Sequence, residues 1–492
     1  MTAVLAIDAG TTGITALVVA DDGRVLARAY REIGQHYPRP GWVEHDAEEI
    51  FLRTVEAARE ALARSPVPPV ALGITNQRET VVVWDRATGR PLHRAIVWQD
   101  RRTAERCREL APHADLVQAR TGLVLDAYFS GTKLEWLLRE ARVLDGREAR
   151  DTAAGTIDSW LVWRLTDGAV HATDPTNASR TMLYDIDARA WSDELLALFG
   201  VPRALLPEVR PSLGDFGTAA PRHLGVPLPI RGVAGDQQAA LFGQGCHAAG
   251  ESKNTYGTGA FVLLNTGGTR PPHAPGVLTT LACDAAGDAA YALEGAIFIA
   301  GAAVQWLRDG LGIIATAAET EALARSVDGT DGVYFVPALV GLGAPDWEPA
   351  ARGTIVGLTR GTTRAHLARA ALEAMAFATR DVLALMSERA GVRFSRLRVD
   401  GGATQNDWLM QFQADVLGVP IERPQVVETT ALGAAGLAGI AAGVWPDAAA
   451  FARSRRVTTF TPGEGRAAAE RGWSGWRRAV RATLAWARDD EP

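Results

Sequence analysis

The chain has 492 residues, 47% of them hydrophobic and 22% charged, which is typical of a globular protein of two or three domains. Its net charge of −6 and its lack of long runs of like charge argue against nucleic acid and anionic membranes as partners. Three scattered cysteines, no signal-peptide pattern and no apolar stretch of the roughly 20 residues that span a bilayer predict a cytoplasmic protein without membrane insertion.

A loop rich in glycine and threonine follows the first expected strand. Residues 4–7 are an apolar run that predicts a short buried strand, and a second such run follows at 14–19. The loop between them, Asp-Ala-Gly-Thr-Thr-Gly at 8–13, has glycines that admit a close ligand, and N–H and hydroxyl groups that can bind anions. Asp8 would then hold a hydrated Mg²⁺ beside bound phosphates. The alternative is a tight hairpin with a solvated aspartate, and these residues alone do not decide between the two.

Strands and helices then alternate through the first half of the chain. Asp46, with Glu49 three residues later, predicts the capped start of a helix. A strand at 71–75 runs into the polar sequence Asn-Gln-Arg-Glu-Thr at 76–80. This order of strands and helix excludes a βαβ dinucleotide-binding fold. The further elements expected here are strands at 81–84 and 95–98, a helix over 130–138 capped by Ser130, a buried helix at 157–165, a polar loop at 173–181 and a surface connection at 202–225.

The pattern of the first residues begins again near residue 250. A strand at 230–234 first ends in Gly-Asp-Gln at 235–237, before a helix. Then Gly-Thr-Gly at 257–259 precedes an apolar strand and a glycine turn, as Gly-Thr at 10–11 does. If the match is real, the protein contains two copies of one topology; the alternative is a chance match of a short motif. The elements expected after it are a strand at 260–264, a helix at 366–389, a strand at 397–399, a helix at 407–417, an Ala/Gly-rich helix ending at 441 and an amphipathic helix at 471–488.

Polar or glycine-rich loops end several of the expected strands. Because ligand sites gather at strand ends in open sheets, we expect these loops to converge in a cleft between two lobes. Neither a Walker A motif nor the protein-kinase catalytic loop is present in the sequence. Phosphates would therefore bind through backbone amides and threonine hydroxyls. The loops are 8–13, 76–80, 235–238, 257–259 and 400–406.

Three groups of side chains in these regions suit phosphoryl transfer to a small polyol. Asp236 is the candidate general base that accepts the proton of an attacking hydroxyl, although a single such Asp is more often a helix N-cap. Arg78 and Glu79 combine donors and an acceptor for a polyol; the alternative is a surface ion pair. Trp98 and Tyr128 would cover the C–H edges of a polyol; the alternative is a pair of core aromatics.

Nine motifs in order and spacing carry a resemblance to a known family. They are DAGTT at 8–12, GITNQRET at 73–80, AIVWQDRRT at 95–103, TGLVLDAYFSGTK at 121–133, TDPTNASRTM at 173–182, AGDQQAALFGQ at 234–244, KNTYGTGAF at 253–261, EGAIFIAGAAVQWLRD at 294–309 and VDGGATQNDWLMQF at 399–412. From residue 3 to about 447, the chain resembles the glycerol kinase branch of the FGGY carbohydrate kinase family. The motifs together separate that branch from kinases of xylulose, gluconate and ribulose.

The resemblance implies a fold, an activity and an assembly. The fold would be α/β, with two actin-like lobes of ribonuclease-H type and a catalytic cleft between them. Residues 1–245 would form the N-terminal lobe with the glycerol site, phosphate loop and catalytic Asp, and residues 246–492 the C-terminal, nucleotide-binding lobe. The activity would be ATP-dependent phosphorylation of glycerol to sn-glycerol 3-phosphate with Mg²⁺ as cofactor. The protein would be a homodimer or homotetramer.

The same resemblance implies a role for each matching residue. Asp236 would be the catalytic base, and Asp8 with Asp236 would lie near the Mg²⁺. Glycerol would be hydrogen-bonded or covered by Arg78, Glu79, Trp98, Tyr128, Asp236, Gln237 and Phe261. The nucleotide would be held by Thr11, Thr12, Gly13, Thr258, Gly301, Gln305, Gly402 and Asn406.

Two stretches depart from the family pattern. Gly13 and Thr15 stand where many members have a serine and an arginine, so a positive charge near the nucleotide phosphates is missing. Residues 222–227 read Arg-His-Leu-Gly-Val-Pro where some members have a Gly-Thr-Arg loop for fructose 1,6-bisphosphate. The sequence therefore predicts no inhibition by that sugar. His223 lacks the aromatic neighbours of the histidine that is phosphorylated in other members, so its phosphorylation is not expected.

Two other functions compete with glycerol phosphorylation. A kinase for another small polyol or a ketose would need a larger pocket, and the aromatic side chains of Trp98, Tyr128 and Phe261 argue against one. An actin-like filament or chaperone would hydrolyse ATP without a small-molecule acceptor. Such a protein has no reason to hold the Arg-Glu pair at 78–79 or the Asp-Gln pair at 236–237.

Overall fold

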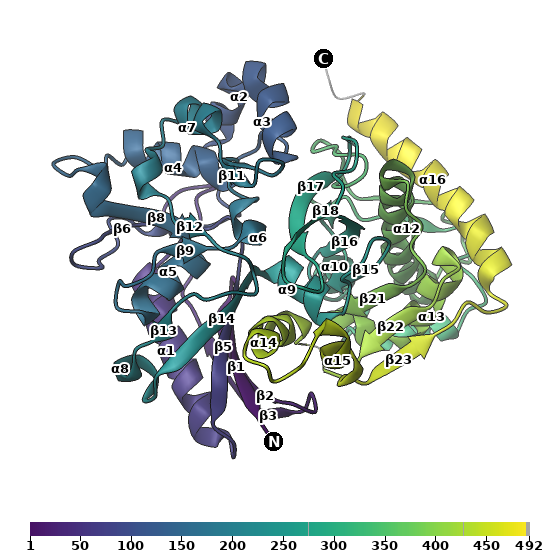
Figure 1. Cartoon of the computed structure of the whole chain (residues 1–492). Helices are drawn as coiled ribbons and strands as arrows, with labels where there is room; N and C mark the ends of the chain where they lie inside the picture. Colours follow the sequence, from purple (N-terminus) through teal and green to yellow (C-terminus); the bar gives the residue numbers. More distant parts are fainter. Residues whose placement is uncertain (274, 427, 489–492) are drawn as a thin grey trace.

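The computed structural model describes residues 1–273, 275–426 and 428–488. Two large mixed sheets, one from each half of the chain, form its framework (Figure 1). The first sheet has the order β13-β14-β5-β1-β2-β3. Its strands are β1 (Ala3–Ala9), β2 (Gly13–Ala20), β3 (Val25–Glu32), β5 (Pro69–Asn76), β13 (Thr218–Ala219) and β14 (Leu228–Gly235).

The second sheet has the order β17-β18-β16-β15-β21-β22-β23. Its strands are β15 (Ser252–Tyr256), β16 (Ala260–Gly267), β17 (Leu278–Cys283), β18 (Ala289–Ile297), β21 (Leu397–Asp400), β22 (Ile421–Pro424) and β23 (Val457–Phe460). In both sheets the first strand pairs antiparallel with the second and parallel with a later strand. The run β14-β5-β1-β2-β3 thus matches β22-β21-β15-β16-β18, and the predicted repetition of one topology is confirmed.

Four smaller sheets of the described residues lie outside the two large ones. One has four strands, in the order β4 (Glu44–His45), β7 (Ala95–Ile96), β6 (Val81–Asp85) and β8 (Thr152–Thr156). The other three have two strands each: β9 (Ala172–Thr173) with β12 (Glu208–Val209), β10 (Tyr184–Asp185) with β11 (Ala190–Trp191), and β19 (Tyr334–Val336) with β20 (Thr354–Val356). The helices are α1 (Ala47–Arg64), α2 (Ala104–Glu109), α3 (Ala114–Thr121), α4 (Ser130–Arg139), α5 (Ile157–Leu165), α6 (Pro175–Ala178), α7 (Asp193–Phe199), α8 (Pro221–Leu224), α9 (Asp236–Gly243), α10 (Gly301–Asp309), α11 (Glu319–Arg325), α12 (Arg364–Ala390), α13 (Asp407–Leu417), α14 (Thr429–Ala441), α15 (Ala448–Arg453) and α16 (Arg466–Arg488). None of the helices in the described part of the chain has both the length and the apolar character needed to span a bilayer.

Helices α9 and α14 lie between the two sheets and pack on each other (Figure 1). Apolar residues of α14 share a core with one face of the first sheet, whose other face packs with α1 and α5. The contact is close because its residues are small, as the sequence predicts. A Cβ on Gly73 would lie 2.1 Å from the Ala434 carbonyl oxygen, and one on Gly433 would lie 1.8 Å from that of Ala239. Glycine is therefore required in β5 where α14 packs on it, and in α14 where α9 packs on it.

Three expectations from the sequence are corrected by the structure. Residues 173–181, expected as a polar loop, are buried and contain α6, whose N-cap Asp174 accepts hydrogen bonds from the backbone N–H groups of Thr176 and Asn177. Ser130 is the first helical residue of α4 and not its cap, because its hydroxyl donates to the Glu79 carbonyl oxygen at 2.9 Å. The strand expected at 95–98 ends at Ile96. Partners distant in sequence hold two of these segments: Glu79 holds Ser130, and Asn76 binds Asn177 in the stretch at 173–181.

Candidate functional site

The carboxyl ends of three parallel strands, each followed by a polar or glycine-rich segment, lie side by side in the first sheet. Ala9 at the end of β1 pairs with Asn76 at the end of β5, and Asn76 pairs with Gly235 at the end of β14. The loops that follow these strands therefore start next to one another. This register brings together the glycine-threonine loop, the Arg-Glu pair at 78–79 and Asp236.

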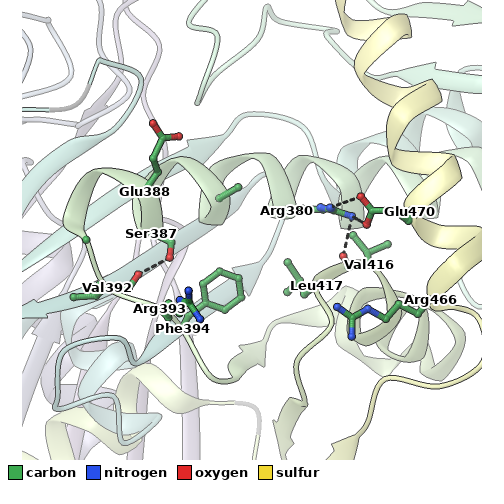
Figure 2. Close-up of a pocket in the computed structure, with 12 residues that line it drawn as sticks. Arg380, Ser387, Glu388, Val392, Arg393, Phe394, Val416, Leu417, Arg466 and Glu470 are labelled. Atoms are coloured by element: carbon green, nitrogen blue, oxygen red, sulfur yellow. Dashed lines mark hydrogen bonds and ion pairs between the residues drawn. The ribbon is translucent and has the colours of Figure 1, made fainter.

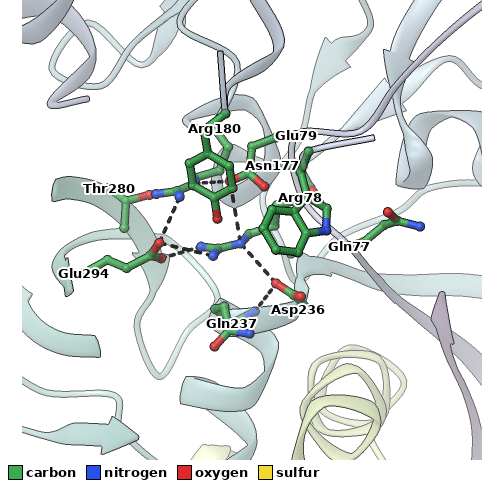
Figure 3. A network of polar contacts seen from close by, with 12 residues as sticks. Gln77, Arg78, Glu79, Asn177, Arg180, Asp236, Gln237, Thr280 and Glu294 are labelled. Carbon is green, nitrogen blue, oxygen red and sulfur yellow. Dashed lines mark hydrogen bonds and ion pairs between the residues drawn. The ribbon is translucent and has the colours of Figure 1, made fainter. Parts of the chain in front are cut away.

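Asp236 faces Arg78 from the start of α9 (Figure 3). Its Oδ1 lies 3.0 Å from Arg78 Nε and accepts a hydrogen bond from the Gln237 backbone N–H at 2.6 Å. The N-cap of α9 is Gly235, so the reading of Asp236 as a simple helix cap is wrong. The Asp236 side chain is 29% exposed whereas that of Arg78 is 2% exposed. The carboxylate is thus held and charge-paired on one side and open to a small ligand on the other.

Four buried charged side chains converge behind Asp236 (Figure 3). Arg78 Nη1 lies 2.5 Å from Glu294, and Arg180 binds Glu79 through Nε at 2.6 Å and Glu294 through Nη2 at 2.9 Å. Each of these side chains is at most 2% exposed. The reading of the 78–79 pair as a surface ion pair is therefore wrong. Sequence reasoning missed Arg180 and Glu294, although a lone glutamate in the otherwise apolar strand β18 is a usable signal.

Glu79 adopts an unusual backbone conformation. Its φ of +63° lies in the left-handed region, which non-glycine residues rarely occupy and which gathers at functional sites. Burial raises the pKa of its carboxyl group, although Arg180 and Arg78 oppose that shift. Among the described residues the Glu79 side-chain contacts go through Oε1, so Oε2 is available to accept a hydrogen bond from a ligand.

Two aromatic side chains join this network to the glycine-threonine loop. Trp98 donates from Nε1 to Thr11 Oγ1 at 2.9 Å, and its ring lies 5.6 Å from the Tyr128 ring, edge to face. Both side chains are only partly buried. Lys133 Nζ donates to the Tyr128 and Trp98 carbonyl oxygens at 2.7 and 3.4 Å, and burial lowers its pKa to about 7. The aromatic pair is therefore fixed at the site and is not part of a closed core.

The loop at 10–13 turns its carbonyl groups inward. Gly10 N donates to the Gly13 carbonyl oxygen at 3.0 Å, which closes the turn. The carbonyl oxygens of Gly10, Thr11 and Thr12 accept hydrogen bonds from Gln77 Nε2, Gln35 Nε2 and Ile33 N, respectively. The N–H groups of Thr11 and Thr12 have no acceptor among the described residues. Unpaired N–H groups beside threonine hydroxyls can bind an anion, which is the predicted role of this loop.

Asp8 lies at the end of β1, just before this loop, and the pKa of its carboxyl group is raised. Burial, together with the negative charge of Asp236, raises the pKa of Asp8 to about 7. No hydrogen bond reaches the Asp8 carboxylate from the described part of the chain, in contrast to Asp236. Two carboxylates that repel each other beside an anion-binding loop are what a bridging cation would stabilise.

The loop at 257–259 is also closed by a glycine-to-glycine backbone hydrogen bond, over one residue fewer than the first loop. Gly257 N donates to the Gly259 carbonyl oxygen at 2.8 Å. The Thr258 carbonyl oxygen accepts from Ala300 N and Ala302 N at 2.9 and 3.0 Å, and the Gly257 carbonyl oxygen accepts from Gly301 N at 3.0 Å. The start of α10 is thereby fixed against this loop. A Cβ on Gly301 would lie 2.6 Å from the Gly257 carbonyl oxygen, so the contact needs glycine.

A buried lysine links Gln237 to the strand before the second loop. Lys253 Nζ donates to Gln237 Oε1, and also to Thr255 Oγ1 at 2.8 Å. Burial lowers the pKa of Lys253 to about 8, while Asp400 and Asp236 oppose the shift. Lys253 thus holds the amide oxygen of Gln237, and the Gln237 NH₂ group remains to donate to a ligand.

The remaining predicted residues occupy the second half of the chain. Gln305 is exposed on α10, and Gly402 is exposed with open space where its side chain would be. Asn406 caps α13, accepting from Leu409 N at 2.9 Å. Phe261 on β16 is partly buried and packs on a small cluster that includes Leu241.

A surface groove of about 480 Å³ lies away from these residues, among α12, α13 and α16 (Figure 2). Arg380 on its wall pairs with Glu470 at 2.6 Å and also donates to the Val416 carbonyl oxygen at 3.2 Å. The arginine is therefore already satisfied by the protein. Neither a phosphate-binding loop nor a strand-end carboxylate borders this groove, so it does not suit phosphoryl transfer.

Comparison with known proteins places the chain in a family. Residues 3–243 match the N-terminal domain of the FGGY family of carbohydrate kinases, and residues 252–442 match its C-terminal domain. The chain is 56% identical to a glycerol kinase of Thermus brockianus over 99% of both chains, and 55% identical to one of Bordetella parapertussis over 99% of this chain and 98% of the other.

A solved structure gives the same result. The structure of Plasmodium falciparum glycerol kinase with ADP matches with a TM-score of 0.92 and 35% identity over 98% of each chain. The expected α/β fold of two actin-like lobes is thereby confirmed. Together, the sheet topology, the strand-end loops and these matches show that the chain belongs to the FGGY family of carbohydrate kinases.

Proposed function

We propose that the chain transfers the γ-phosphoryl group of ATP to a terminal hydroxyl of glycerol, giving sn-glycerol 3-phosphate and ADP. The observation that carries the proposal is the contact of Asp236 with Arg78, 3.0 Å apart, beside the loop at 10–13. Together with the register of β1, β5 and β14, this contact supports a site in which Asp236 would be the base, Arg78 and Glu79 would bind the polyol and the loop at 10–13 would bind phosphate. The relatives with 55–56% identity over nearly the full chain are named glycerol kinase, which supports glycerol as the acceptor.

Asp236 acts as the general base in this proposal. The free oxygen of the Asp236 carboxylate accepts the proton of the glycerol hydroxyl while the hydroxyl oxygen attacks the γ-phosphorus. The bond from the γ-phosphorus to the β,γ-bridging oxygen breaks, and ADP leaves. The Arg78 guanidinium, 3.0 Å from Asp236, orients this carboxylate. The outward N–H groups of Thr11 and Thr12, with Thr258 from the second loop, stabilise the negative charge of the phosphates.

Mg²⁺ would be held by Asp8 and Asp236 and would neutralise charge on the phosphate oxygens. The fit rests on the two repelling carboxylates and on the Asp8 oxygens, which lack a hydrogen-bond donor among the described residues. In the described ranges no group of three or more His, Cys, Asp or Glu side chains could hold a metal. The remaining ligands would thus be phosphate oxygens and water, as Mg²⁺ prefers.

A coupled assay of ADP release over a panel of acceptors tests the proposal. The panel contains glycerol, xylulose, ribulose, gluconate and no acceptor, each with saturating Mg-ATP. We expect turnover with glycerol and at most traces elsewhere, since Trp98 and Tyr128 narrow the site. Faster turnover with a ketose would point to the second candidate substrate class. Equal turnover without any acceptor would replace the proposal with an actin-like ATPase.

Assembly, location and regulation remain predictions. A homodimer or homotetramer in the cytoplasm is expected, and so is insensitivity to fructose 1,6-bisphosphate. His223 lies 2.7 Å from Asp167 and its ring packs on Phe51, so its imidazole already has protein partners. Activity measured with and without the bisphosphate checks the regulatory prediction; clear inhibition would contradict it.

A further inference from the structure

A glutamate from the second half of the chain lies inside the polyol site of the first half. Glu294 is on β18, where its neighbours in the strand are apolar, and its side chain is fully buried. Its Oε2 lies 2.5 Å from Arg78 Nη1, and its Oε1 accepts from Arg78 Nη2 at 3.2 Å and from Arg180 Nη2 at 2.9 Å. One carboxylate thus orients two guanidinium groups (Figure 3).

The hydrogen bonds of Arg78 leave it little freedom. Two of its nitrogens face Glu294 and Nε faces Asp236, while Nη1 also reaches Gln238 Oε1 at 3.3 Å. A guanidinium has five N–H groups; here three of them, on Nη1 and Nη2, donate to Glu294 and Gln238. The Nε N–H faces Asp236 as an ion pair without a hydrogen bond, and one N–H on Nη2 remains for a ligand. The bidentate contact with Glu294 is what fixes the plane in which that donor points.

Arg180 transmits the same constraint to Glu79. It binds Glu79 through Nε at 2.6 Å and Glu294 through Nη2, and it has no exposed surface. Glu79 therefore keeps one oxygen for a ligand only while Arg180 is itself held by Glu294. Both members of the polyol-binding pair depend on the same carboxylate.

The charge of Glu294 is maintained by its partners. Burial alone would raise the pKa of Glu294, but Arg180 and Arg78 hold that pKa at about 2. Buried ion clusters of this kind seldom raise stability above that of an apolar core of the same volume. A role in orienting functional groups is the better physical explanation for the charge.

We infer that Glu294 is a positioning residue that sets the affinity of the site for its polyol by orienting Arg78 directly and Glu79 through Arg180. This inference rests on the proposed function, because it assumes that Arg78 and Glu79 contact the substrate. It assigns Glu294 no contact with the substrate itself. The expected signature is a change in polyol affinity that leaves the nucleotide site unaffected.

The test compares Glu294→Gln with the matched control Glu135→Gln. Glu135 also takes two arginines, Arg106 and Arg139, each at 2.9 Å with 5% of its side chain exposed, but lies outside the site. For Glu294→Gln we expect the KM for glycerol to rise about 10- to 100-fold, the scale of one charged hydrogen bond, with the KM for ATP unchanged. For Glu135→Gln we expect a lower melting temperature and an unchanged KM for glycerol. A Glu294→Gln enzyme with wild-type KM for glycerol would overturn the inference.

A double-mutant cycle separates positioning from a general structural role. If Glu294 acts through Arg78 and Arg180, then Glu294→Gln should raise the KM for glycerol by a smaller factor in an Arg78→Ala background than in the wild type, because only the route through Arg180 remains. Additive effects on KM would refute the inference. Should Glu294→Gln fail to fold, Arg180→Lys keeps the charge but loses the two-point contact, and the same rise in KM for glycerol is expected from it.

Failure of the proposed function would be recognised separately. The wild-type enzyme is assayed first on the acceptor panel, and KM is then measured for the acceptor that it turns over fastest. A preference for another polyol would contradict glycerol phosphorylation, while the KM of the Glu294 variants for that polyol would still test the positioning role. ATP hydrolysis that no acceptor stimulates would contradict both.

Discussion

The loops at 10–13 and 257–259 are closed by the same kind of hydrogen bond, over four and three residues respectively, but differ in what surrounds them. Each closes with a hydrogen bond from its first glycine N–H to its last glycine carbonyl, at 3.0 and 2.8 Å. The first loop is held by strand and side-chain donors such as Gln35 and Gln77, and the second by the start of α10. The fold thus supplies two glycine turns, and different neighbours hold each of them in place.

The carboxylates near the two loops show that difference most clearly. Asp8, two residues before Gly10, receives no hydrogen bond among the described residues, and burial with the charge of Asp236 raises its pKa to about 7. The corresponding position in the second half is Thr255, which pairs with Asp400 on the next strand. Asp400 accepts from Gln244 Nε2 at 2.9 Å and from Thr429. The Asp8 carboxylate is thus left without a donor among the described residues, whereas the Asp400 carboxylate is hydrogen-bonded to two side chains.

The strongest test of this division removes the candidate base. Asp236→Asn should lower kcat by about 10²- to 10⁴-fold, the usual contribution of a general base, because the amide cannot accept the hydroxyl proton. ADP binding, measured by calorimetry, should be retained. The control is Asp46→Asn, the N-cap of α1, since Asn caps helices as well as Asp does. An Asp236→Asn enzyme with more than a tenth of wild-type kcat would show that the base lies elsewhere.

The two unlike carboxylates give the second prediction. Asp8→Asn should raise the Mg²⁺ concentration for half-maximal activity about 10- to 100-fold, on the scale of disrupted metal sites, while stability stays equal or rises because a repulsion is removed. Asp400→Asn should instead lower the unfolding free energy by about 1–3 kcal/mol, since two buried hydrogen bonds to a charge are weakened. Mg²⁺ titrations of activity and urea unfolding of both variants measure these two effects. If Asp8→Asn lowered the unfolding free energy and left the required Mg²⁺ concentration unchanged, Asp8 would have a structural role and no role in Mg²⁺ binding.

Two glycines, one in the first loop and one at the start of α10 that contacts the second loop, give the third prediction. A Cβ on Gly301 would lie 2.6 Å from the Gly257 carbonyl oxygen, which is backbone, whereas one on Gly13 would lie 2.4 Å from the hydroxyl of Tyr30, a side chain 40% exposed that can move. Gly301→Ala should therefore raise the KM for ATP about tenfold, equivalent to about 1.4 kcal/mol of overpacking, and leave the KM for glycerol unchanged. Gly13→Ala should have a smaller effect, and Tyr30→Ala should reverse it. An equal effect of both substitutions would mean that the two loops are equally rigid.

The sequence predicted most of the scaffold and the part of the site that lies in strand-end loops. Helices α5 and α13 begin and end at the expected residues, because apolar content and capping signals are local. The resemblance also identified the family correctly. Glu294 and Arg180 were missed because their partners are about a hundred residues away or more, and no local pattern shows which strands will meet. The buried polar stretch at 173–181 was misread for the same reason.

The smallest predicted effect concerns the two lysines of the chain, one in each half. Lys133 lies behind the aromatic pair and Lys253 before the second loop, and both are fully buried. Burial lowers the pKa of Lys133 to about 7 and, against the opposing charges of Asp400 and Asp236, that of Lys253 to about 8. Between these values and the unfolded pKa near 10.4, the unfolded chain binds a proton that the folded chain lacks, so stability rises with pH.

Replacing each lysine by methionine should remove its share of that rise. Each pH unit in the window contributes at most about 1.4 kcal/mol per lysine, so Lys133→Met should lose about 1–2 kcal/mol of the gain between pH 7.5 and 9. Lys253→Met should lose a smaller part of the gain in stability between pH 7.5 and 9, because the pKa of Lys253 in the folded chain is about one unit higher than that of Lys133. Only Lys253→Met should also raise the KM for glycerol, because it releases Gln237. Urea unfolding at both pH values measures the difference. Parallel pH profiles for wild type and Lys133→Met would mean that Lys133 stays protonated, and that two backbone carbonyls suffice to hold a buried charge beside the polyol site.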